Sequence, residues 1–142
     1  MKIYMGSDHA GYLLKDALKG ALAKEFEVVD CGTNSSESVD YPDYANLVCS
    51  KMSTGDRGIL VCYTGIGMSI AANKHKGIRA ALVGKLDDAV LTREHNDANV
   101  LCLSAKNTSF DEALAICKAF LTTSFTGGRH QRRVEKIGQI EQ

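Results

Sequence analysis

The sequence has no tryptophan, a single proline and no net charge, since 17 lysines and arginines match 17 aspartates and glutamates. Without an excess of positive charge, the molecule lacks the overall field that attracts nucleic acids or anionic membranes. The scarcity of proline, with 13 glycines in 142 residues, excludes collagen-like and low-complexity chains. Any anionic ligand must therefore be small and held by a local group of side chains.

Long apolar runs are also absent, because no stretch approaches the roughly 18 apolar residues of a membrane-spanning helix. The apolar start of the chain, residues 1–5, is too short for a secretory signal. The five cysteines show neither C-x-x-C nor zinc-finger spacing, which favours reduced thiols buried in a core. We therefore expect a cytoplasmic protein whose residues 1–142 form a single domain.

Short apolar runs alternate with segments of helical periodicity along the whole chain. The run at 58–63 is apolar throughout, as expected for a central parallel strand that is buried on both faces. Strands are predicted at 2–7, 27–31, 58–63, 79–83 and 99–103, and helices at about 14–22, 42–52, 64–74, 87–94 and 113–121. The pattern predicts an α/β fold, a three-layer αβα Rossmann-like domain with a five-stranded parallel sheet and a C-terminal helix after residue 127.

Ligand sites in such folds lie at the carboxyl ends of the strands. Asp8 and His9 follow the first strand, whereas Cys62 ends the third and leads into Thr64-Gly65-Ile66-Gly67. Glycines there allow close approach of the backbone, and the N–H groups of the following helix favour an anion or a thiolate. Spacing alone fits purely structural interpretations equally well. In these, the glycines form a tight strand-to-helix turn, Asp8 caps a helix, and Cys62 is a thiol in the core.

The glycines at 65 and 67 do not form a nucleotide fingerprint. Ile70 stands where a dinucleotide-binding loop needs a third glycine or alanine, and the chain has no phosphate-binding loop of the type G-x-x-x-x-G-K-S/T. The sequence therefore supports neither NAD nor ATP as a cofactor.

Two polar clusters lie near other predicted strand ends. His95 and Asn96 close a helix, where they form either an ordinary polar terminus or an acid–base group beside a sugar-binding amide. Arg129 and Arg133 share one helical face, either as a solvated surface or as two guanidinium groups that grip one phosphate. Lys106 adds a positive charge just past the fifth strand, although an exposed lysine is usually only solvated.

Taken in order, six segments give the chain a specific resemblance to type B ribose-5-phosphate isomerase. They are residues 6–11, 40–42, 58–74, 77–80, 95–100 and 127–130, which together span nearly the whole chain. The wider family of sugar-phosphate isomerases includes the subunits of galactose-6-phosphate isomerase. The resemblance implies interconversion of D-ribose 5-phosphate and D-ribulose 5-phosphate through a cis-enediolate, in the non-oxidative pentose phosphate pathway, with no cofactor and no metal.

The same resemblance assigns roles to single residues. Cys62 moves the proton between the first two sugar carbons, and Thr64 relays protons between the oxygens. His95 opens the furanose ring, and Asp8 handles the anomeric hydroxyl. The implied substrate-binding residues are Gly65, Ile66, Gly67 and Met68 at the oxyanion, Tyr41 and Asn96 at the sugar hydroxyls, and His9, Lys106, Arg129 and Arg133 at the phosphate.

In this family the site draws residues from two subunits, which implies a homodimer or tetramer and no nucleic-acid or membrane partner. Two positions depart from the family pattern. Tyr63 replaces a frequent glycine and would narrow the pocket, whereas Lys106 replaces an arginine and loses its two-pronged geometry. Two alternatives are an isomerase of allose 6-phosphate or galactose 6-phosphate, and a non-catalytic phosphate-binding module, which the fold alone would permit.

Overall fold

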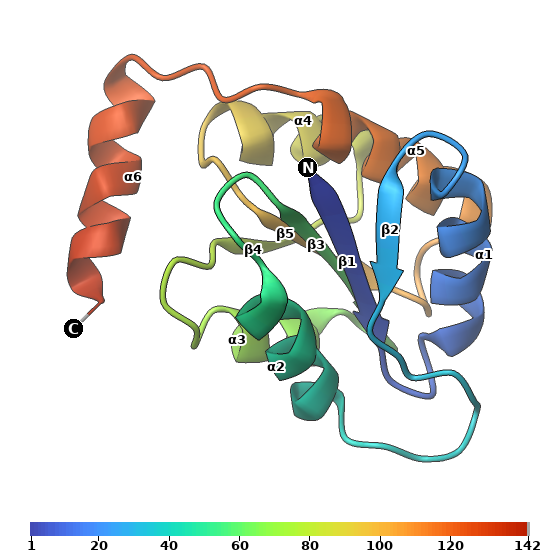
Figure 1. Ribbon diagram of the computed structural model, residues 1–142. Helices are drawn as coiled ribbons and strands as arrows, with labels where there is room; N and C mark the ends of the chain where they lie inside the picture. The colour runs from blue at the N-terminus through green and yellow to red at the C-terminus, as the bar shows by residue number, and fades with distance from the viewer. Residues whose placement is uncertain (142) are drawn as a thin grey trace.

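The computed structural model describes residues 1–141, in which a five-stranded parallel sheet lies between two layers of helices (Figure 1). The strands are β1 (Lys2–Ser7), β2 (Glu27–Asp30), β3 (Arg57–Cys62), β4 (Ala80–Leu82) and β5 (Val100–Ser104). The helices are α1 (Tyr12–Leu22), α2 (Tyr41–Lys51), α3 (Ile66–Ala72), α4 (Leu86–Glu94), α5 (Phe110–Thr122) and α6 (Arg129–Ile140). The predicted three-layer fold with a C-terminal helix is confirmed.

Two hydrophobic clusters pack against the sheet, one on each face. One contains Leu18 of α1, Ala89 of α4 and Phe120 of α5, and the other contains Val48 of α2 and Met68 of α3. The strand order is β2-β1-β3-β5-β4. Connections that run toward the β2 edge therefore pass over the face of α1 and α4, and those that run toward the β4 edge pass over α2 and α3. This division is the one that right-handed crossovers require.

The handedness of these connections creates a crevice at the carboxyl end of β3. Strand β3 lies between β1 and β5. After β1 and β5 the chain turns toward the face of α1 and α5, whereas after β3 it turns toward the opposite face. Loops that separate in this way leave room for a ligand. Cys62, the last residue of β3, stands at this point.

The loop between β2 and α2 is tied to α1 by a buried lysine. The Lys15 side chain is completely buried, and its Nζ donates to Asp30 Oδ1 at 2.7 Å, to the Thr33 carbonyl at 2.7 Å and to Asn34 Oδ1 at 3.2 Å. These three bonds use all the hydrogen-bond donors of an ammonium group. The start of the 31–40 loop is therefore held in one place beside the crevice.

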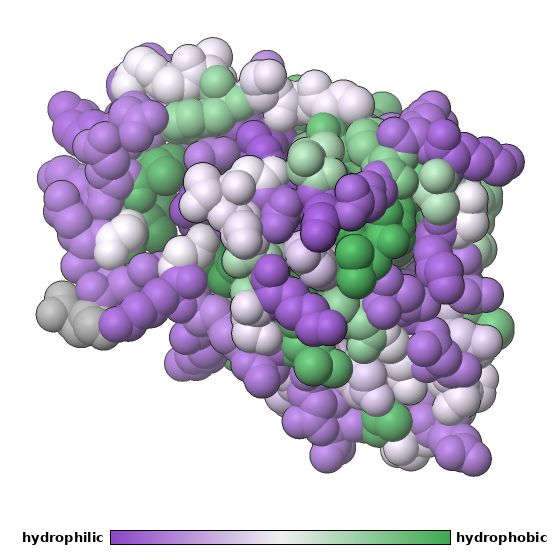
Figure 2. All heavy atoms as spheres, in the orientation of Figure 1, coloured by the Kyte–Doolittle hydropathy of each residue, from purple (hydrophilic) through white to green (hydrophobic). Residues whose placement is uncertain are grey.

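Helix α6 stands apart from the layered body of the protein (Figure 1). Along Arg129–Ile140 no residue is buried, and Figure 2 shows hydrophobic surface between this helix and the body. Its C-terminal end touches the body where the Gly77 N–H donates to Glu141 Oε1 at 2.9 Å. None of the helices within residues 1–141 combines the length and hydropathy of a membrane-spanning segment.

Candidate active site

A cleft of about 430 Å³ opens at the carboxyl end of β3. It draws residues from the end of β1, the start of α2 and the turn between β3 and α3. Its lining residues are Asp8, Tyr41, Cys62, Tyr63, Thr64, Ile66, Gly67 and Ile70. Six of the predicted site residues are therefore brought together from segments that are far apart in the sequence.

The turn after β3 places a backbone donor on the Cys62 sulfur. The Gly65 N–H donates to Cys62 Sγ at 3.2 Å, and the side chain of Cys62 is only 4% exposed. Gly65 has φ of +78°, and a Cβ there would lie 3.0 Å from the Leu103 carbonyl, so only glycine fits this turn. An N–H aimed at sulfur stabilises negative charge on it, which suits a thiol that exchanges a proton with a substrate.

The other four cysteines do not line the cleft, within residues 1–141, and their environments are apolar. Burial raises the pKa of Cys49 to about 11 and that of Cys117 to about 12. Burial also raises the pKa values of Cys31 and Cys102. These four thiols therefore stay protonated at neutral pH, and their packing roles match the core positions predicted for most cysteines.

Asp8 lines the cleft and accepts a hydrogen bond within the turn that precedes α1. The carboxyl group is buried, and its Oδ1 accepts the Gly11 N–H at 3.0 Å. The cleft position therefore holds, whereas the helix-cap interpretation is wrong, because the N-cap of α1 is Gly11 and no side chain within residues 1–141 caps this helix. The neighbouring His9 accepts the Val39 N–H at Nδ1, 3.2 Å away, which leaves Nε2 of the neutral ring as its donor. Through Val39, the 31–40 loop fixes the tautomer of this histidine.

Tyr41 lies over the first turn of α3. A Cβ at Gly67 would come within 2.6 Å of two atoms of the Tyr41 ring, so this close packing depends on glycine. Thr64 Oγ1 accepts the Ile66 N–H at 3.3 Å, which holds its hydroxyl at the mouth of the turn. Met68 is fully buried in the core under α3, so its side chain does not line the cleft.

The rim of the cleft contains two residues that were not among the predicted site residues, Tyr63 and Ile70. Tyr63 is 55% exposed, and Lys106 Nζ lies 5.6 Å from the centre of its ring. Lys106 also donates its backbone N–H to the Tyr63 carbonyl at 2.9 Å. Ile70 follows Ile66 by one helical turn, and this four-residue spacing of exposed isoleucines is the signal that could have identified it.

Eight predicted site residues are absent from the cleft lining within residues 1–141: His9, Gly65, Met68 and Lys106, described above, and His95, Asn96, Arg129 and Arg133. The ring of His95 stacks on that of His130 with centroids 4.3 Å apart. Desolvation, with the charges of His95, Arg129 and Arg133, lowers the pKa of His130. Asn96 lines a separate hollow of about 270 Å³ together with Ile137 of α6.

The cleft offers a thiol, a carboxyl group, two kinds of hydroxyl and a backbone N–H within one crevice. This set is suited to moving protons on a carbonyl compound and to stabilising the oxyanion that forms. Among residues 1–141, no three His, Cys, Asp or Glu side chains are grouped as metal ligands.

Comparisons with known proteins agree over nearly the whole length. The sequence profile of the Ribose/Galactose Isomerase family matches residues 3–137. Ribose-5-phosphate isomerase B of Escherichia coli (strain K12) is 46% identical, over 99% of this chain and 97% of the relative. The structure of Clostridium thermocellum ribose-5-phosphate isomerase B gives a TM-score of 0.96 at 51% identity, over 99% of this chain and 97% of that chain.

A further solved structure carries a ligand. Ribose-5-phosphate isomerase B from Mycoplasma genitalium, with bound ribulose-5-phosphate, gives a TM-score of 0.95 at 47% identity, over 99% of this chain and 95% of that chain. The sequence profile, the full-length identity and the three-dimensional similarity all indicate the same family. This chain belongs to the ribose/galactose isomerase family.

Proposed function

We propose that this chain is a type B ribose-5-phosphate isomerase, which interconverts D-ribose 5-phosphate and D-ribulose 5-phosphate. The observation that carries the proposal is the Gly65 N–H on Cys62 Sγ, inside a cleft that also contains Asp8 and Thr64. The relatives support it, because the Escherichia coli protein carries that name and the Mycoplasma genitalium structure holds ribulose-5-phosphate. The chain acts as one isomerase domain.

The proposed chemistry follows from the groups in the cleft. In the open-chain aldose, the Cys62 thiolate takes the proton from C2, and the electron pair moves through C1 to the carbonyl oxygen, which gives a cis-enediolate. The backbone N–H groups of residues 65–68 stabilise the negative oxygen. Thr64 relays a proton between the two oxygens, and Cys62 returns its proton to C1, which leaves the ketone at C2. Asp8 handles the anomeric hydroxyl while the ring opens.

The remaining predicted residues come to the cleft from a second copy of the chain. His95 then opens the ring, Asn96 binds a sugar hydroxyl, and Arg129 and Arg133 hold the phosphate with His9 and Lys106. Two features support this homodimer. Along Arg129–Ile140 the helix that carries both arginines buries none of its residues, and Ile66 and Ile70 leave apolar surface at the rim of the cleft. Tyr41 orients the sugar from the same subunit as Cys62.

The free thiols of the chain support a reducing compartment, and we place the enzyme in the cytoplasm. The reaction proposed belongs to the non-oxidative pentose phosphate pathway.

The proposal is tested by measuring formation of ribulose 5-phosphate from D-ribose 5-phosphate by the purified, EDTA-treated protein. Cys62→Ser is expected to lose about 10²–10⁴-fold in kcat, the range that proton transfer by a side chain contributes, and to keep substrate binding. Cys31→Ser is the matched control, because Cys31 is a half-buried thiol outside the cleft, and it should keep full activity.

The alternatives give different results in the same experiment. An isomerase of six-carbon sugars would turn over allose 6-phosphate or galactose 6-phosphate and leave ribose 5-phosphate unchanged. A non-catalytic binding module would bind ribose 5-phosphate in calorimetry with no turnover in the wild type. Equal activity of Cys62→Ser and the wild type would overturn the assignment of Cys62 as the proton carrier.

A further inference from the structure

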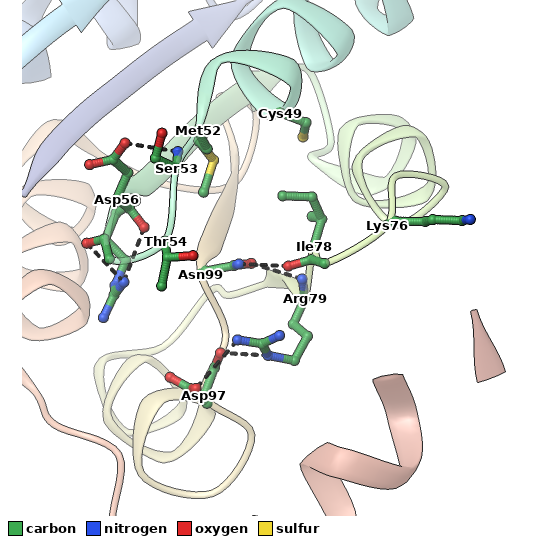
Figure 3. Close-up of a pocket in the computed structure, with 13 residues that line it drawn as sticks. Cys49, Met52, Ser53, Thr54, Asp56, Lys76, Ile78, Arg79, Asp97 and Asn99 are labelled. Carbon is green, nitrogen blue, oxygen red and sulfur yellow. Dashed lines mark hydrogen bonds and ion pairs between the residues drawn. The ribbon is translucent and has the colours of Figure 1, made fainter. Parts of the chain in front are cut away.

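A second cavity, of about 480 Å³, lies at the opposite edge of the sheet, where the strands begin (Figure 3). Arg57 is the first residue of β3, Arg79 directly precedes β4, and Asn99 directly precedes β5. The parallel register, in which Gly58 and Ala80 both pair with Val100, places these three positions side by side. Within residues 1–141 this cavity shares no lining residue with the Cys62 cleft.

Positive charge exceeds negative charge around this cavity. Arg79 Nη2 pairs with Asp97 Oδ2 at 3.3 Å, and the buried Arg93 pairs with Asp97 Oδ1 at 2.7 Å, so both oxygens of this carboxylate are occupied. The other acidic residue in the lining, Asp56, already accepts backbone N–H groups at both carboxylate oxygens. Arg79 and Arg93 therefore share one carboxylate, and Arg57 has no carboxylate partner among the residues described.

Arg57 is the least compensated of these arginines. Its Nη1 donates only to the carbonyls of Gly55 and Asp56, and its Nε is buried with no hydrogen-bond partner within the described chain. Burial and the charge of Arg93 lower the pKa of Arg57, with Asp97 opposing the change. A buried donor without a partner costs free energy, so Arg57 is held at this edge without full compensation.

We infer that this cavity is a second binding site, which takes a small phosphate-bearing anion between Arg57 and Arg79. Guanidinium groups match the geometry of phosphate oxygens, and an anion here offsets the excess charge of the arginines. Lys76 extends away from the other labelled residues in Figure 3, so the arginines supply the charge. Met52 and Ile78 form an apolar wall that fits the organic part of a phosphate monoester.

The test is a titration of the ¹⁵N-labelled full-length protein, followed by NMR, first with inorganic phosphate and then with phenyl phosphate. Saturable shifts of the Gly55, Gly77 and Asn99 amides are expected in the wild type, with tighter binding of phenyl phosphate if an organic part is recognised. Arg57→Gln should weaken these shifts about tenfold or more, because a hydrogen bond to a charged group is lost. Shifts of the Gly65 and Gly67 amides should remain, because they report the other end of the sheet.

Arg132→Gln is the matched control, since it removes the same charge from an exposed position on α6 and should leave the titration unchanged. Arg57→Gln should retain isomerase activity, which checks its folding. If that variant does not fold, Arg57→Lys keeps the charge but loses the two-pronged geometry, and binding should still weaken. Equal shifts with sodium chloride at the same ionic strength, linear shifts without saturation, or unchanged binding in Arg57→Gln would each mean an adventitious ion only and overturn the inference.

Discussion

The two edges of the sheet hold cavities of similar size but opposite construction. At the carboxyl edge, among the residues described, none that lines the Cys62 cleft carries a positive charge. At the amino edge, Arg57 and Arg79 are supplied by the starts of the strands themselves. The cleft proposed to take a sugar phosphate therefore depends on cations from outside its own lining, whereas the arginine cavity is complete within one chain. Four predictions test the two edges.

The largest effect is expected from removing the cations that a second copy brings to the cleft. The double variant Arg129→Ala and Arg133→Ala should lose about 10²-fold or more in kcat/KM, mainly through KM, because two charged contacts to phosphate disappear. Steady-state kinetics measures this loss. Phosphate binding at the amino-edge cavity should not change.

Mixing this double variant with Cys62→Ser decides whether the site is shared. If each site combines Cys62 of one copy with the arginines of another, re-formed mixed dimers regain roughly a quarter of the wild-type sites. If all these residues act within one chain, no mixture recovers activity. The cleft would then be complete within one chain, like the arginine cavity.

A smaller effect concerns the lysine that holds the loop beside the cleft. Lys15→Met should lower the free energy of unfolding by about 3–5 kcal/mol, because it leaves the Asp30 carboxylate without its buried partner. Lys19→Met is the control, because Lys19 also pairs with Asp30, at 3.1 Å, from a partly exposed position, and should cost about 1 kcal/mol or less. Urea denaturation measures both, and equal losses would contradict the role of burial.

The smallest expected effect is on how the free energy of unfolding depends on acid pH, through one carboxylate at each edge of the sheet. Burial alone would raise the pKa of Asp30, but hydrogen bonds from Lys15, the Gly32 amide and Lys19 outweigh it and lower the pKa. The amides of Lys2 and Ser53 lower the pKa of Asp56 at the amino edge. A carboxyl group whose pKa is lower in the folded than in the unfolded protein stabilises the fold. This stabilisation is fully present above the pKa of the unfolded chain, about 4, and is lost as the pH falls through the pKa of the folded protein.

Unfolding followed between pH 6 and pH 2 checks this sign. Asp30→Asn should flatten the acid part of the stability curve, and Asp56→Asn should flatten it less, because the bonds of Asp56 are exposed to solvent. If the free energy of unfolding fell more steeply with acid in either variant than in the wild type, the pKa of that carboxyl group would not be lowered by folding.

Much of the carboxyl edge was predictable from the sequence. The apolar run that ends at Cys62 predicts a central strand, and parallel strands bring their carboxyl ends to one edge, so Asp8 and Cys62 had to lie near each other. Backbone N–H groups near the sulfur were predictable, but the Gly65 N–H as the donor was not, because it depends on the left-handed backbone at Gly65. The separation of His95 from the cleft follows from the tertiary path of the chain, which local spacing does not encode.

The amino edge was not predicted, for a different reason. In the sequence, Arg57 and Asp97 lie between predicted elements and Arg79 begins a predicted strand, and only the register of β3, β4 and β5 brings them around one cavity. Lys15 was missed in a similar way, because a lysine in an amphipathic helix reads as solvated. Its acceptors, Asp30 at the end of β2 and Thr33 after it, belong to another segment, and the helical pattern does not reveal that this segment meets α1.

The enclosed amine of Lys15 also has a chemical consequence. Reagents that acylate lysines need access to Nζ, and the native protein does not offer it, because all three N–H groups donate to oxygens in a buried site. Lys15 becomes available to such a reagent only when the 31–40 loop separates from α1. Its labelling, read by mass spectrometry, would report how often the chain opens beside the cleft.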